Sequence, residues 1–336
     1  MNSERNRKGL LQHLGIKHHE YWSWWWFSFP IWPQWIWYAI KLRNPTWFTA
    51  VNPGIEHSGF TEESKFDILS ILPKENVPET ILIDFEKPLP HTLLSFPCIA
   101  KPDIGGRGRK IKIIHTFTDL EEYHRTVGEH YLLQEVINYN LELGVFYARI
   151  PSECKGNIIS ITEKDFLKVV GDGLHTIEEL LQNSFRAQGQ LSRLAHTIDL
   201  SEVLPDKEER IIEPIGNHCR GTVFLDKSNR ITSLMEHNFD KIAKQIPGFY
   251  YGRFDIRVRS WDDFIQGKEI YILELNGLTS MDTHIFDPQF KLRNVLPVLI
   301  KNCNFCYRIA RENLKRNIPT SPLGIILKKS LAFFNE

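Results

Sequence analysis

The chain has 336 residues, of which 42% are hydrophobic and 24% are charged, so it is long enough for two or three packed subdomains and shows no compositional bias towards disorder. Its 41 basic residues balance 41 acidic ones, which argues against a nucleic-acid binder and confines any phosphate recognition to one place. The five cysteines suggest no disulfide framework and no cleavable signal peptide is evident, so we expect a reducing, cytoplasmic compartment.

The N-terminal region, residues 1–90, opens with a polar and basic stretch followed by an uncharged aromatic segment at 21–40. That segment, YWSWWWFSFPIWPQWIWYAI, holds seven of the nine tryptophans. Its length approaches the roughly 20 residues of a membrane span, but two prolines interrupt it, and Trp and Tyr favour the membrane interface. Residues 21–43 therefore predict a peripheral anchor on anionic lipid at the inner membrane face in preference to a span. The alternative is an aromatic face that packs on the protein or lines a pocket for an apolar substrate.

Further along the region, Asn52, Pro53 and Gly54 signal a loop, and a short helical pattern runs from Glu62 to Leu72. A segment punctuated by prolines then leads to "AKPDIGGRGRKI", residues 100–111, which concentrates three glycines and four cations. Apolar residues precede this cluster and an alternating run of isoleucines follows it, which predicts a turn between two strands. Glycine lets backbone N–H groups approach a polyanion while Lys and Arg neutralise it, so the turn predicts a phosphate site; a solvated basic hairpin is the alternative.

The next elements are a helix through "TDLEEYHRTVG", for which we predict a cap at Thr118 with Glu121 three residues on, and a buried strand in "YLLQEVI". Beyond them strands and helices alternate in mixed order, which favours an α+β fold over a doubly wound one. His237 lies in an amphipathic helical pattern and is interpreted as structural. Cys303 and Cys306 have CxxC spacing without a second ligand pair, so they predict core residues on a helix and not a zinc site.

Two strand patterns near the C-terminal third carry alternating charges. In "GRFDIRV", residues 252–258, Phe254, Ile256 and Val258 would face the core while the charged residues line the other side. In "EIYILELNG", residues 269–277, Glu274 and Asn276 share a face, with Leu273 and Leu275 on the opposite one. If the two strands pair as a hairpin, Asp255, Glu274 and Asn276 converge as hard oxygen ligands of the kind that Mg²⁺ prefers. The alternative is a solvated sheet face.

A glycine turn for phosphate and a carboxylate and amide set for Mg²⁺ together describe a site for a metal nucleoside triphosphate. No GxxxxGK[ST] P-loop and no kinase HRD or DFG motif occurs. Over roughly residues 90–300 the chain resembles the ATP-grasp superfamily, in its D-alanine:D-alanine ligase and cyanophycin synthetase branches. Four motifs carry the resemblance in order: "AKPDIGGRGRKI", "LLQEVI", "KVVGDGLHTIEELL" and "GRFDIRV…ILELNG".

The resemblance implies a nucleotide held between two subdomains. A glycine-loop lid would span residues 91–133, a larger metal and substrate subdomain residues 134–310, and a tail residues 311–336. Within the lid, Lys101 would contact the nucleotide phosphates, and a loop would close over them that consists of Gly105, Gly106, Arg107 and Gly108.

The hinge between the subdomains is implied to bind adenine along Gln134, Glu135, Val136 and Ile137, with backbone groups of Glu135 and Ile137 reading its edge. Related ligases have an acidic residue at the position of Gln134. Glu142, a few residues further on, is the candidate ribose ligand. In the resemblance Asp255, Glu274 and Asn276 match the metal ligands, and Arg253 matches the arginine that stabilises developing charge during catalysis.

The function implied is an ATP-dependent ligase that activates a small-molecule carboxylate as an acyl phosphate and joins it to an amine. ATP and Mg²⁺, with Mn²⁺ as an alternative ion, would be required, and no protein nucleophile is needed. Two alternatives stay open: an ATP-grasp enzyme with a thiol or phosphoryl acceptor, and a non-catalytic, membrane-associated nucleotide-binding module. In "EPIGNHCRG", residues 213–221, Arg220 is a candidate contact for a substrate carboxylate or phosphate, with an ordinary turn as the alternative.

Overall fold

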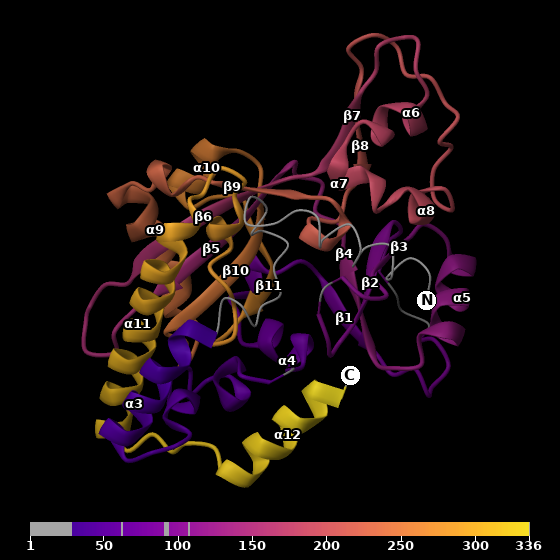
Figure 1. The fold of residues 1–336 in the computed structure, drawn as a ribbon. Coiled ribbons are helices and arrows are strands. Elements are labelled where there is room, and N and C mark those ends of the chain that lie inside the picture. The colour runs from indigo at the N-terminus through magenta and orange to yellow at the C-terminus, as the bar shows by residue number, and fades with distance from the viewer. Residues whose placement is uncertain (1–28, 62, 91–93, 107, 336) are drawn as a thin grey trace.

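The computed structural model describes residues 29–61, 63–90, 94–106 and 108–335. In this part of the chain two larger sheets lie side by side, and a small unit of two strands and three short helices projects from them (Figure 1). The ladders between the described strands are antiparallel, and helices and strands follow one another in mixed order. These features confirm the predicted α+β class.

The smaller sheet has four strands in the spatial order β1-β4-β2-β3. Their bounds are β1 (Thr80–Ile83), β2 (Cys98–Pro102), β3 (Lys112–Ile114) and β4 (Tyr131–Glu135). Helix α5 (Phe117–Val127) packs on one face through Leu120, Tyr123 and Val127, which recur at helical spacing. The turn between β2 and β3 is the glycine-rich segment, as the flanking apolar runs predict.

The larger sheet has five strands in the order β11-β10-β5-β6-β9. Their bounds are β5 (Leu141–Ala148), β6 (Asn157–Asp165), β9 (Val223–Asp226), β10 (Tyr251–Val258) and β11 (Ile270–Asn276). Its apolar face packs against α9 (Ser233–Lys244) and α10 (Trp261–Gln266), where the Phe239 ring lies 5.0 Å from Phe254 and 5.9 Å from Phe264. The charged positions of β10 lie on the opposite face.

A third unit interrupts the larger sheet between β6 and β9. It comprises the hairpin of β7 (Leu167–Val170) and β8 (Glu209–Glu213) with α6 (Ile177–Gln182), α7 (Phe185–Gln188) and α8 (Leu191–Leu194). A separate apolar cluster, with Ile177, Leu181 and Leu204 among its members, holds this unit together. The unit is the projection at the upper right of Figure 1.

Three helices gather at the opposite end of the molecule: α3 (Trp32–Leu42), α11 (Val295–Lys315) and α12 (Leu323–Asn335) (Figure 1). They share one apolar cluster, to which Trp35 and Tyr38 of α3 contribute from one side and Ile326 of α12 from another. The Tyr38 ring stacks on Tyr307 of α11 at 4.0 Å. On α11 the two cysteines of the CxxC spacing are buried free thiols, as predicted.

The aromatic segment is described from Phe29 onward, and residues 21–28 lie outside the described part of the chain. Pro33 stands in the first turn of α3, where its missing N–H costs no helical hydrogen bond. One face of α3 packs on the protein, as the packing alternative predicts, and the other face is exposed. No described helix is long and apolar enough to cross a membrane.

The segment after α3 docks on the end of β11. Gly59 has φ +78°, and a Cβ on it would lie 2.6 Å from the Cα of Gly277, the residue that follows Asn276. The Ser58 carbonyl accepts a hydrogen bond from the Leu278 N–H at 2.9 Å. Only glycine allows this approach of two backbones, so the N-terminal segment is fixed beside the end of the β10–β11 hairpin.

Two local predictions from the sequence need correction. The helix of residues 62–72 is shorter, since α4 spans Lys65–Ser70 and is capped by Ser64. Helix α5 is capped by Thr116 and not by Thr118, and the Asp119 carboxylate completes a capping box with the Thr116 N–H. Both threonines have an acid three residues on, and the earlier one lies two residues after β3, where the backbone is still extended.

The predicted subdomain boundaries stay a prediction. The four-stranded sheet takes β1 from before residue 91, and its strand β4 ends at Glu135, beyond residue 133.

We expect Thr116→Ala to lower the free energy of unfolding by about 1 kcal/mol, because the Asp119 N–H loses the side-chain acceptor that caps the helix. Thr118→Ala is the matched control and should change stability by less than about 0.5 kcal/mol, as an exposed position without a cap bond. Urea denaturation followed by far-UV circular dichroism measures both. Equal effects at the two positions would contradict the cap assignment.

Candidate functional site

Strand β10 places apolar and charged side chains on opposite faces, as the alternation predicts. Phe254, Ile256 and Val258 are fully buried in the core below the sheet. Arg253 and Asp255 lie on the other face and contact one another, with the Arg253 Nη2 3.0 Å from the Asp255 Oδ2. The polar face of the five-stranded sheet therefore carries the candidate site.

The β10–β11 hairpin forms with the register that the site requires. Asp255 pairs directly with Glu274, and Arg253 pairs with Asn276. The Asn276 Nδ2 donates to the Asp255 Oδ2 at 3.2 Å. The structure thus brings together on one sheet face the three residues predicted as metal ligands.

A bulge in this hairpin corrects one detail of the pattern. The pairing passes from Asp255↔Glu274 to Ile256↔Ile272, so Leu273 is left without a Cα partner on β10. Ile272 and Leu275 are therefore the core residues, while Leu273 is only partly buried. The Leu273 carbonyl accepts a hydrogen bond from the Lys101 ammonium of the other sheet at 3.0 Å.

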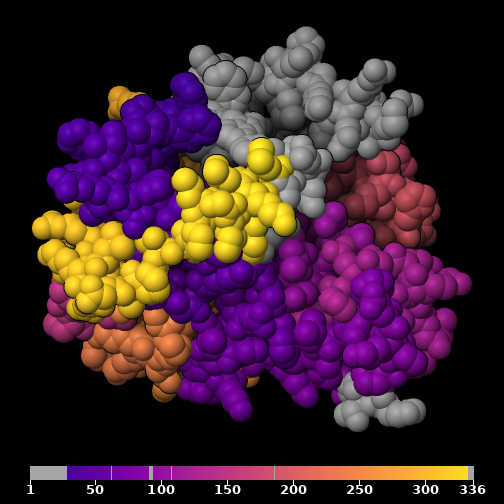
Figure 2. All heavy atoms as spheres, turned by 90° about the horizontal axis from the view of Figure 1, so that it is seen from below, coloured from indigo at the N-terminus to yellow at the C-terminus, as the bar shows by residue number. Residues whose placement is uncertain are grey.

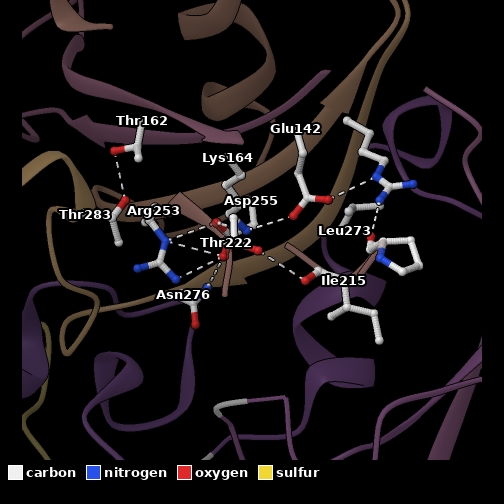
Figure 3. Close-up of polar contacts among 12 residues, drawn as sticks. Glu142, Thr162, Lys164, Ile215, Thr222, Arg253, Asp255, Leu273, Asn276 and Thr283 are labelled. Atoms are coloured by element: carbon white, nitrogen blue, oxygen red, sulfur yellow. Dashed lines mark hydrogen bonds and ion pairs between the residues drawn. The ribbon is translucent and has the colours of Figure 1, made fainter. Parts of the chain in front are cut away.

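Asp255 is the centre of a buried charge network (Figure 3). Its Oδ1 lies 3.1 Å from the Lys164 Nζ, and Arg253 donates to both carboxylate oxygens. Burial alone would raise the pKa of Asp255, but the neighbouring Arg253 and Lys164 outweigh it and lower the pKa to about 2. Asp255 is therefore ionised throughout the physiological range.

Two glycines make room for this network. Gly144 of β5 faces Asp255, and a Cβ there would lie 3.2 Å from the Thr283 Oγ1 and 3.4 Å from the Arg253 Cδ. Gly216 covers the network from the loop after β8, where a Cβ would lie 2.4 Å from the Glu142 Oε1. Larger side chains at either position would displace the charged groups.

Lys164 of β6 is a site residue that the sequence motifs did not identify. Its Nζ bridges Asp255 and Glu142, which it contacts at 2.9 Å through Oε1. Burial disfavours its charge, but the two carboxylates prevail and raise the pKa of Lys164. Glu142, the predicted ribose ligand, is engaged on its other oxygen by the Arg257 Nε at 3.0 Å. Both oxygens of Glu142 are thus in ion pairs.

Lys101 connects the two sheets. It lies on β2 of the four-stranded sheet, is 7% exposed, and donates to the Gln134 Oε1 at 2.9 Å as well as to the Leu273 carbonyl of β11. Burial lowers the pKa of Lys101 to about 8, and Glu274 is the charge that most strongly opposes this shift. The predicted phosphate ligand and the predicted metal ligands therefore meet between the sheets.

The glycine turn after β2 is held by cations from two other parts of the chain. Lys65 of α4 donates to the Asp103 carbonyl at 3.1 Å and to the Gly105 carbonyl. Arg220 donates through Nη2 to the Gly108 carbonyl at 2.8 Å. In this structure Arg220 is therefore hydrogen-bonded to the backbone of the turn. Gly105 and Gly108 have φ values of +105° and +70°, and Gly106 lies between them. Arg107 lies outside the described residues.

The predicted adenine hinge is the connection from the four-stranded to the five-stranded sheet. Gln134 and Glu135 end β4, and Val136 and Ile137 lead on towards β5. Gln134 is buried, with its amide donating to the Thr80 Oγ1 while its carbonyl accepts from Lys101. The Glu135 N–H donates to the Glu79 carbonyl, and the Ile137 carbonyl accepts from the Arg257 Nη1 at 2.8 Å.

The donor set of Asp255, Glu274 and Asn276 fits a magnesium ion in its chemistry. It offers two carboxylates and an amide oxygen on adjacent strands, whereas no group of three or more His, Cys, Asp or Glu side chains suited to a metal occurs among the described residues. Asp255 forms ion pairs with Arg253 and Lys164. A metal ion would therefore have to share this carboxylate with two cations.

The sequence matches no family model and no curated protein. Solved structures of ligases do match. D-alanine–D-alanine ligase from Bacillus anthracis complexed with ATP is 15% identical with a TM-score of 0.42, over 74% of this chain and 67% of that chain. A bifunctional glutathione synthetase from Pasteurella multocida is 15% identical with a TM-score of 0.37, over 71% and 35%. The ATP-grasp ligase PsnB, complexed with minimal precursor, is 14% identical with a TM-score of 0.37, over 72% and 60%.

Two of these structures are named ligases, and one of the two is named an ATP-grasp ligase. The chain spans about a third of the matched glutathione synthetase.

We expect Lys164→Met to lower the free energy of unfolding by about 3–5 kcal/mol near neutral pH, because it leaves two buried carboxylates short of a cation. The loss should shrink in acid, since without Lys164 the buried Asp255 carboxylate can then take up a proton. Lys168→Met is the matched control: Lys168 pairs with two carboxylates in an exposed setting, so its loss should cost less than about 1 kcal/mol. Chemical denaturation at several pH values measures both, and similar losses for the two variants would exclude Lys164 as the ion that neutralises the site.

Proposed function

We propose that the chain is an ATP-dependent ligase that joins a small-molecule carboxylate to an amine, with Mg-ATP converted to ADP and phosphate. The observation that carries the proposal is the contact between Lys101 of one sheet and the Leu273 carbonyl of the other. It sets a buried cation and a glycine turn opposite the strand that bears Glu274 and Asn276. A triphosphate between the sheets would meet cations on one side and metal ligands on the other.

Three cations, Lys101, Arg253 and Lys164, and the glycine turn would bind the phosphates. Lys101 would contact the nucleotide phosphates, and the turn of Gly105, Gly106, Arg107 and Gly108 would cover them with backbone N–H groups. Arg253 and Lys164 lie beside Asp255 and would meet the negative charge of the phosphoryl group in transfer. Adenine would lie along residues 134–137 at the hinge, and Glu142 would hold the ribose if it gives up one of its two ion pairs.

Magnesium would be held by Asp255, Glu274 and Asn276. When bound, the ion would supply positive charge that offsets the negative charge of the phosphates. Mn²⁺ prefers the same hard ligands and is an alternative ion.

The reaction runs in two displacements. An oxygen of the acid's carboxylate attacks the γ-phosphorus of ATP, the bond to the β-phosphate oxygen breaks, and an acyl phosphate and ADP result. The amine nitrogen then attacks the acyl carbon, the C–O bond to phosphate breaks, and the amine loses a proton as phosphate leaves. Lys101 and Arg253 stabilise the charge on the transferring group and on the tetrahedral oxyanion, so that no protein nucleophile is required.

The test of the function is ADP release by the purified chain with Mg²⁺ and pools of candidate acids and amines, with mass spectrometry of the product. An amide product supports the proposal. A thioester or a phosphorylated product would move the chain to a related ATP-grasp enzyme with another acceptor. ATP binding without any turnover would favour a nucleotide-binding module without catalysis.

Glu274→Gln should lower kcat by about 10²-fold or more while leaving the fold intact, because it removes a negative metal ligand at nearly constant volume. Glu269→Gln, an exposed change at the residue just before the same strand, is the matched control and should keep its activity. ADP release across a Mg²⁺ titration measures both. Near-normal turnover of Glu274→Gln at saturating Mg²⁺ would remove Glu274 from the site.

The charge of Lys101 gives the proposal a pH dependence. With a pKa of about 8, the ammonium is largely present at pH 7 and largely lost at pH 9, so the Kd for Mg-ATP should rise about tenfold between them. Glu274, Asp255 and Glu142 favour the protonated form, and Lys65 disfavours it. Lys101→Arg stays charged over this range and should flatten the profile, whereas Lys101→Ala should bind ATP weakly at both pH values. Isothermal titration calorimetry measures the Kd; a wild-type profile as flat as that of the arginine variant contradicts the role of Lys101.

A further inference from the structure

Helix α3 presents an apolar face away from the protein. Ile36, Trp37 and Ile40 are 60%, 59% and 63% exposed, and Phe29 just before the helix is 68% exposed. Ile36 and Ile40 stand one helical turn apart and Trp37 lies beside them, so these side chains form one continuous strip. Scattered exposed apolar residues are ordinary, but a strip of this kind marks an interaction surface.

Helix α12 presents a second strip of the same kind. Leu323, Leu327 and Leu331 recur every four residues and are 46%, 53% and 64% exposed. Ile326, on the other side of the helix, is 4% exposed and anchors α12 to the apolar cluster that also receives α3. Viewed from below, Figure 2 shows the indigo N-terminal part of the chain and yellow α12 next to each other on one face. We call the exposed strips of α3 and α12 the α3–α12 face.

The charges around this face have one sign. Neither α3 nor α12 contains an acidic residue, while Lys41, Arg43 and Lys328 are exposed on the two helices or at their ends. The negative charge of Glu56 is already compensated by Lys329 of α12, whose Nζ lies 3.3 Å from the Glu56 Oε1. The occupant of the face should therefore be apolar at its centre and negative at its rim.

We propose that the α3–α12 face docks on the surface of a bilayer that contains anionic lipid. The apolar strips would lie at the boundary of headgroups and acyl chains, where Trp and flanking lysines are favoured, and the cations would meet the lipid phosphates. A second copy of the chain fits less well, because a symmetric contact through this face would bring like charges together. The inference adds a lipid partner and does not depend on the ligase chemistry.

The test is sedimentation of the full chain with vesicles of phosphatidylcholine, with and without the anionic lipid phosphatidylglycerol. We expect binding to the anionic vesicles with a blue shift of Trp emission, and only partial release by high salt, since the apolar contribution is not screened. The double variant Lys41→Glu, Lys328→Glu should weaken binding to anionic vesicles only, because it loses two cations but keeps the apolar strips.

Ile36→Glu and Leu327→Glu should each lower the vesicle partition coefficient by about tenfold or more, since each removes an apolar side chain from the contact. Leu174→Glu is the matched control: Leu174 is 79% exposed on the projecting β7–β8 unit, and its change should leave partition unaltered. Far-UV circular dichroism checks the fold of each variant. A wild-type chain that ignores anionic vesicles overturns the proposal, and so does a dimer in sedimentation velocity that Ile36→Glu dissociates. Equal losses for Leu174→Glu and Ile36→Glu would also overturn it.

Discussion

The charge balance around Asp255 is the constraint on which the rest of the site depends. A carboxylate at 5% exposure is tolerated only because Lys164 and Arg253 approach it on different sides. These cations come from β6 and β10, so strand order and register are tied to electrostatics: a slip of one residue would turn Asp255 into the apolar core. The charged side chains also explain why glycines stand at two nearby positions, Gly144 on β5 and Gly216 in the loop before β9. Larger residues there would fill the space that the charged side chains occupy.

Stability alone does not account for such a network. Well-packed apolar residues would stabilise the sheet as much or more, because they avoid the free-energy cost of removing ions from water. The two carboxylates and three cations of this network fit the proposed function, in which a polyanion with its counter-ion would match both signs of charge. The exposed strips of α3 and α12 make a parallel case elsewhere on the molecule, where apolar side chains stay in contact with water.

Much of the site follows from local patterns. Alternation along residues 252–258 separates the core face from the charged face, and the spacing of Glu274 and Asn276 puts them on one side of β11. Lys164 could not be found this way, because its role arises from β6 lying next to β5 in space, and a single lysine in a strand has no signature. The bulge at Leu273 and the choice between Thr116 and Thr118 as cap depend on tertiary contacts that compete with equally good local alternatives.

The hydrogen bonds of Lys101 bear on the nucleotide affinity that the proposed function requires. Its ammonium already donates to Gln134 on the same sheet and to the Leu273 carbonyl on the other sheet, and the second bond joins the two sheets. These two bonds use two of the three N–H groups of the ammonium, so in the proposed function the affinity for phosphate would depend on how far Lys101 can turn towards it without losing the Leu273 carbonyl. A phosphate that drew Lys101 away from the Leu273 carbonyl would loosen one sheet from the other, so the proposed nucleotide binding would be coupled to the spacing between the two sheets.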